Sequence, residues 1–119
     1  MDKYWKDKWV DALRSGNYVQ TEGTLCQVED GPDGVVDTYC CLGVLCELVP
    51  GIIKEELDDD DDDGIVFQYT YNKTSGIGRL PRDISGIAHL SVGVETTLVQ
   101  INDDGASFEE IADYIENNL

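Results

Sequence analysis

A run of acids in the middle of the chain limits the fold more than any other feature. Between Glu55 and Asp63, eight of nine residues are acidic, and Asp58 to Asp63 are six consecutive aspartates. A carboxylate that leaves water without a partner is strongly destabilising, so this run cannot enter a core. We therefore predict that residues 55–64 form a solvated, mobile loop insertion, and that the core is built from the segments on either side.

The segment before Gly16 has the pattern of an amphipathic helix. Trp5, Trp9 and Leu13 follow one another at spacings of four residues and so share one face. Gly16 is typical of the residue just past a helix end. We expect a helix that packs its tryptophan face on the core.

Residues 18–49 predict a β-hairpin followed by a buried helix. The segments 18–28 and 35–39 are rich in residues that favour strands, and turn-forming residues 30–34 separate them. Residues 40–49 are apolar nearly all round, with leucines at helical spacing, and Pro50 follows. The three cysteines of that run are interpreted as core thiols, since free cysteine packs as a small hydrophobe.

The second half of the chain predicts one strand, a loop and three helices. We expect the strand at 65–71, the loop at 72–76, and helices at 80–89, at 94–102 and from Ser107 onward. Ser107 and Glu110 have the spacing of a capping box, which marks the start of the last helix. The fold class is therefore α+β: a single domain, 1–119, with four to five helices around a small antiparallel sheet made of a hairpin and one strand.

The charge balance restricts the possible partners. The chain has 25 acids and 8 bases, a net charge of −17, and 17 acids remain when the eight of the run are set aside. Nucleic acids and anionic membranes both need cationic groups, so neither is an expected partner, whereas a basic protein is. The N-terminal residues lack the apolar core of a secretory signal and no apolar run could span a membrane, so we expect a cytoplasmic protein.

Patterns that carry catalysis or hold a metal are weak. His89 is the single histidine, and we interpret it as a helix cap or core-edge residue rather than a general base. Cys40, Cys41 and Cys46 lack the second ligand pair of a zinc site. An EF-hand loop starting at Asp59 would place Thr70 where a glutamate is required. We expect no enzyme activity, no metal and no cofactor.

Two groups of residues could carry binding. Cationic and aromatic side chains suit an anionic ligand that contains a nucleobase. Six residues are candidates for such a site: three arginines, two aromatic residues and one nearby glutamine. They are Trp9, Arg14, Tyr18, Gln20, Arg79 and Arg82. The alternative is that the first helix has a solvated charged face and that its tryptophans are core residues. The second group is the run Asp58, Asp59, Asp60, Asp61, Asp62 and Asp63, either a surface that faces a partner or a solubilising loop.

Three segments resemble a family of small proteins encoded by bacteriophages and prophages. They are Trp9-Val10-x-Ala12-Leu13-Arg14-Ser15-Gly16-x-Tyr18-x-Gln20, Tyr39-Cys40-Cys41-Leu42-Gly43-Val44-Leu45-Cys46-Glu47-Leu48 and Asn102-Asp103-x-Gly105-Ala106-Ser107-Phe108-Glu109-Glu110-Ile111-Ala112-Asp113. The aspartate run is not part of this pattern, so a function shared by the family would not depend on it. The resemblance implies an origin more than a mechanism, with an infected bacterial cell as the setting.

That origin suggests counter-defence by binding, by one of two routes. The first is sequestration of a small nucleotide-derived immune signal, with the protein acting as a sponge. The second is an acidic nucleic-acid mimic that blocks a basic host defence protein. A structural role in the particle and a homo-oligomeric state both stay open.

Overall fold

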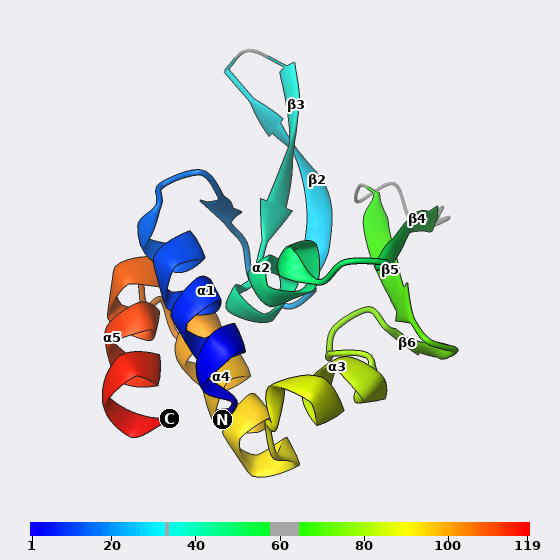
Figure 1. Cartoon of the computed structure of the whole chain (residues 1–119). Coiled ribbons are helices and arrows are strands. Elements are labelled where there is room, and N and C mark those ends of the chain that lie inside the picture. Colours follow the sequence, from blue (N-terminus) through cyan, green and yellow to red (C-terminus); the bar gives the residue numbers. More distant parts are fainter. Residues whose placement is uncertain (33, 58–64) are drawn as a thin grey trace.

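A computed structural model describes residues 1–32, 34–57 and 65–119, which form an α+β domain (Figure 1). The helices are α1 (Lys3–Arg14), α2 (Cys41–Leu48), α3 (Arg82–Ala88), α4 (Val92–Asp103) and α5 (Phe108–Asn118). The strands are β1 (Val19–Gln20), β2 (Cys26–Gly31), β3 (Gly34–Tyr39), β4 (Ile53–Leu57), β5 (Val66–Tyr71) and β6 (Thr74–Gly76). The predicted fold class and all five predicted helices are confirmed.

The helix ends follow from local capping groups. The Asp2 carboxylate accepts a hydrogen bond of 3.1 Å from the backbone N–H of Trp5 and so caps α1. At the start of α5, the Ser107 hydroxyl accepts from the Glu110 N–H, and the Glu110 carboxylate accepts from the Ser107 N–H, both at 3.2 Å. The predicted capping box is therefore present, and it satisfies two N–H groups that the helix itself leaves unbonded.

Most of the sheet consists of two hairpins, β2–β3 and β4–β5, that diverge from a narrow junction. Its strand order is β1-β3-β2-β5-β4, with β6 paired to β5. All pairs are antiparallel except β1 with β3. β2 and β5 share a single registered pair, Gln27 with Val66. In Figure 1 the β2–β3 hairpin extends away from the helices, while β4, β5 and β6 form a second arm whose β6 lies beside α3.

The sheet is larger than predicted because two strands lie in segments expected to be loops. Glu55, Glu56 and Leu57 belong to β4, where they pair with β5 and point exposed carboxylates to solvent. The predicted start of the loop insertion at residue 55 is therefore wrong, and residues 58–64 lie outside the described part of the chain. Residues 74–76 form β6 on the other side of β5. The strand predicted over 18–28 is interrupted at Gly23, whose φ of +82° forms a turn between β1 and β2.

Helix α2 is the centre of the core. Its residues from Cys41 to Cys46 are all buried, so the interpretation of Cys40, Cys41 and Cys46 as buried free thiols is confirmed. A Cβ atom on Gly43 would lie 1.8 Å from the carbonyl oxygen of Leu25, so only glycine lets α2 lie this close to the backbone just before β2. Helix α1 packs against both α2 and α5. Among the described residues, no helix is long and apolar enough to cross a bilayer.

Candidate functional site

Two of the predicted ligand residues are bonded inside the protein. The Trp9 ring is fully buried, and its Nε1 donates a hydrogen bond of 2.8 Å to the carbonyl oxygen of Cys41. The Gln20 amide nitrogen donates to Asn102 Oδ1 at 2.9 Å and to the carbonyl oxygen of Ala106 at 2.7 Å. Trp9 is therefore a core residue, the alternative weighed from the sequence, and Gln20 joins β1 to the segment between α4 and α5.

Arg14 and Tyr18 also contact protein groups rather than one shared pocket. The Arg14 guanidinium donates to Asp113 at 2.6 Å and to Glu116 at 2.5 Å, and these hydrogen bonds raise the pKa of Arg14. The Tyr18 ring meets the Tyr39 ring edge to face, with centroids 5.4 Å apart. Arg14, Tyr18 and Gln20 therefore do not meet at one ligand pocket, because each is directed to a different part of the domain.

The other two predicted ligand residues, Arg79 and Arg82, do come together. They line a hollow of about 300 Å³ between α3 and α4. Arg79 donates a hydrogen bond of 3.0 Å to the Thr96 hydroxyl, and the Arg82 side chain is exposed. Within the described residues neither guanidinium has a carboxylate in ion-pair range, unlike Arg14 and Lys54. The hollow therefore presents two guanidiniums that form no ion pair within the described residues.

The wall of the hollow contains a buried carboxylate that the sequence did not single out. Glu95 is 6% exposed; it accepts a hydrogen bond of 2.8 Å from the Leu80 N–H and one of 3.4 Å from the Ser85 hydroxyl. It lies three and seven residues before the buried Leu98 and Asn102, so helical spacing alone places it on the inner face of α4. The sequence therefore indicated an acid on the inner face of α4. Because acids are rarely buried, such a residue is a candidate for a functional role.

Leu80 and Val92 complete the lining with apolar groups, and Val92 is strongly exposed at the rim. The site thus combines two guanidiniums, one buried acceptor and an apolar wall. Small-molecule sites commonly have this composition, mostly apolar with a few placed polar groups, and the volume lies at the lower end of their usual range.

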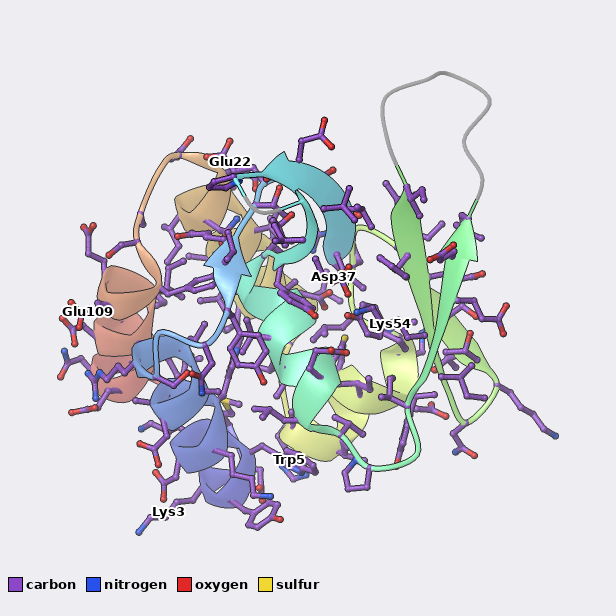
Figure 2. The ribbon with its side chains drawn as sticks, turned by 90° about the horizontal axis from the view of Figure 1, so that it is seen from above. Lys3, Trp5, Glu22, Asp37, Lys54 and Glu109 are labelled. Atoms are coloured by element: carbon purple, nitrogen blue, oxygen red, sulfur yellow. The ribbon has the colours of Figure 1, made fainter. Side chains whose placement is uncertain are left out.

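A second polar cluster surrounds Lys54, between the two hairpins. Its Nζ lies 3.1 Å from Asp37, 3.3 Å from the Tyr39 hydroxyl and 3.6 Å from Glu47. Lys54 reaches toward Asp37 across the space between the hairpins, as Figure 2 shows. The ammonium also lies 4.5 Å from the centroid of the Phe67 ring. Sequence reasoning missed this cluster, because its members come from four separate elements.

The Lys54 cluster holds a permanent cation rather than a reactive amine. Burial lowers the pKa of Lys54, but the hydrogen bond to Asp37 and the surrounding negative groups raise it, and the net change is upward. For the neighbouring Cys26 thiol, which is neutral when protonated, burial raises the pKa to about 11. Neither group is an activated nucleophile near neutral pH. The cluster therefore joins β4 to β3 and α2 as an ion-pair network.

Neither the single histidine nor the acidic side chains of the described residues form a catalytic or metal site. His89 is the C-cap of α3, with a left-handed φ of +55° and an exposed side chain, so its interpretation as a cap is confirmed. Among the residues that the structure describes, no three His, Cys, Asp or Glu side chains gather as a metal site would require. The predicted acidic surface, Asp58 to Asp63, lies outside them.

Comparison with known proteins gives a family without an assigned activity. A protein-family model described as "Domain of unknown function (DUF8296)" matches residues 1–119. No curated protein and no solved structure matches the chain.

Proposed function

Because the chain belongs to this family of unknown function, we propose a function from its own residues: it is a non-catalytic protein that sequesters a small, anionic, nucleotide-derived ligand between Arg79 and Arg82. The setting suggested by the sequence resemblance is phage counter-defence, in the cytoplasm of an infected bacterium, where the ligand would be an immune signal. The observation that carries the proposal is the pair of guanidiniums, without an ion pair among the described residues, over one hollow.

The charge of the chain makes that observation informative. With 25 acids against 8 bases, a guanidinium has many carboxylates available, and Arg14 engages two of them. Arg79 and Arg82 lie beside the hollow without doing so in the described residues. A planar guanidinium binds phosphate through two parallel hydrogen bonds, so two of them can hold a phosphate or pyrophosphate group.

The other lining groups suit the rest of a nucleotide. Glu95 is held by the Leu80 N–H and the Ser85 hydroxyl, and a carboxylate has more lone pairs than these two bonds use. It can accept a hydrogen bond from a base N–H or a sugar hydroxyl. Leu80 and Val92 offer apolar contact for the face of a base. A ligand that carries both an anionic group and a hydrogen-bond donor therefore fits best.

Isothermal titration against cyclic nucleotides and ADP-ribose derivatives tests the proposal. We expect heat with at least one of them, and about a tenfold or greater loss of affinity in the double variant R79A/R82A, because charge-assisted hydrogen bonds are lost. Lys3→Ala is the matched control, since it removes an exposed cation of α1 that does not line the hollow. Absence of heat with every compound, together with no small molecule released from the denatured protein, would remove the proposal.

An acidic mimic that blocks a basic defence protein is the second candidate. The observation that favours it is the charge of residues 15–53, which contain six acids and no lysine or arginine. A pull-down from host lysate should then recover a basic nucleic-acid-binding protein, and capture should weaken with salt. Replacing Asp58 to Asp63 by glycine and serine separates the effect of the aspartate run from that of the acids in the rest of the domain. If capture persists unchanged, the acidic body of the domain carries it.

A further inference from the structure

We propose that the open edge of β3, residues 34–37, docks an extended basic segment of a partner protein by strand addition. This surface is distinct from the hollow, because it uses no residue of α3 or α4. The inference therefore stands whether or not the hollow binds a nucleotide.

The edge is open because β1 is much shorter than β3. β1 pairs with Thr38 and Tyr39, whereas β2 pairs with β3 along its whole length from the other side. Among the described residues no strand lies against the outer edge of residues 34–37. In Figure 1 this part of the hairpin projects away from the helices, with space on its outer side.

The direction of the backbone groups follows from one hydrogen bond. The Tyr39 carbonyl accepts from the Thr21 N–H at 2.8 Å, so the backbone of Tyr39 faces β1. N–H and C=O groups alternate in direction along a strand, so those of Asp37 and Val35 also face the outer edge. The parallel ladder with β1 uses the Asp37 carbonyl, so the groups left open are the N–H of Asp37 and both the N–H and C=O of Val35, in the spacing that an added strand needs.

This edge lacks the usual protection against strand addition. Natural edge strands commonly carry lysines, prolines or bulges that discourage pairing. Residues 34–37 contain no lysine or proline; their one charged residue, Asp37, is paired with Lys54. They expose two valines, Val35 at 70% and Val36 at 38%. Their side chains point to opposite faces of the strand, so an added strand would meet an apolar contact on each face.

Charge selects a basic occupant over a second copy of this chain. Glu29 and Asp30 are exposed on β2, directly across from Val36 and Val35, and no base occurs between Arg14 and Lys54. Two copies would bring equal acidic edges together, each on a protein of net charge −17, and like charges repel. A segment that alternates cationic and apolar side chains places its apolar row on the face of one valine, and its cations are attracted by the β2 carboxylates one strand further away.

A synthetic peptide of alternating lysine and valine, capped at both ends, is a suitable probe for nuclear magnetic resonance and fluorescence anisotropy. We expect saturable binding that weakens with salt, shift changes along β3, and slower hydrogen exchange of the Val35 and Asp37 amides. A peptide with glutamate in place of lysine is the control and should not bind.

Blocking backbone pairing distinguishes strand addition from general charge attraction. Methylating alternate backbone nitrogens of the peptide keeps its charge and should weaken binding about tenfold or more. Val35→Pro removes an outward N–H without removing a hydrogen bond to β2, and should act likewise, whereas Val35→Thr should not. Equal binding by the methylated peptide, protection located elsewhere, no binding at all, or self-association through β3 would each overturn the proposal.

Discussion

Replacing Asn102 by alanine should lower the free energy of unfolding by about 3–5 kcal/mol, most of it from two backbone groups that lose their partner. Asn102 is fully buried at the end of α4. Its Oδ1 accepts from the Cys41 N–H at 3.2 Å, and its Nδ2 donates to the Thr21 carbonyl at 2.9 Å. Gln20 also bonds to Oδ1 but keeps its bond to Ala106, so it loses less.

The magnitude follows from those partners. A buried backbone group left without a hydrogen bond costs roughly 1–3 kcal/mol, and alanine leaves two such groups. Part of the volume of the amide also becomes a cavity, which adds to the loss. Because small domains are stable by only about 5–15 kcal/mol, the variant should unfold at a much lower urea concentration.

Urea unfolding followed by circular dichroism measures the effect. Asn118→Ala is the matched control, since Asn118 is exposed and donates a single local hydrogen bond to the Tyr114 carbonyl. That control should change stability by less than about 0.5 kcal/mol. If Asn102→Ala costs no more than the control, with an unchanged slope against urea, the assignment of Asn102 as the buried link between α4, α2 and β1 is refuted.

Three further outcomes are expected. Gly43→Ala should destabilise by more than about 2 kcal/mol in a thermal melt, because its methyl group would meet the Leu25 carbonyl, whereas Gly86→Ala in α3, with open space around it, should stabilise by about 0.5–1 kcal/mol. Thiol labelling at pH 8 should be slow until the protein is denatured, since burial raises the pKa of Cys26 and Cys40 to about 11. Stability should fall as pH rises from about 9 toward 11, because unfolded thiols release their protons there while the folded ones keep them; a flat urea midpoint over that range would contradict these shifts.

The elements that the sequence predicted are those with local signals. The capping pair Ser107 and Glu110, Gly16 after α1, and the turn residues before β3 each specify structure within a few positions. β4 was missed because Glu55 and Glu56 have low strand propensity and adjoin the aspartate run. Their strand conformation comes from pairing with β5, a distant partner that local pattern does not contain.

The same distinction explains the candidate site. Trp9 and Arg14 have the residue types of a ligand site, but their partners Cys41 and Asp113 lie 32 and 99 positions away and use them internally. Arg79 and Arg82 were grouped with them by charge, and the hydrogen bonds of segment 79–85 to Glu95 and Thr96 bring that pair to one hollow. The residues of the Lys54 cluster come from four elements, so the cluster could be recognised only from the three-dimensional structure.

The packing of the first helix on the last has a consequence for biosynthesis. Arg14 is joined to Glu116, 102 positions later, so α1 leaves the ribosome long before α5 exists. During that interval the face of α1 that α5 will cover has no partner, and contacts between distant segments form slowly in any case. Translation of α5 is therefore the step that gives this face of α1 its partner, and a nascent chain paused before α5 would expose that face to chaperones.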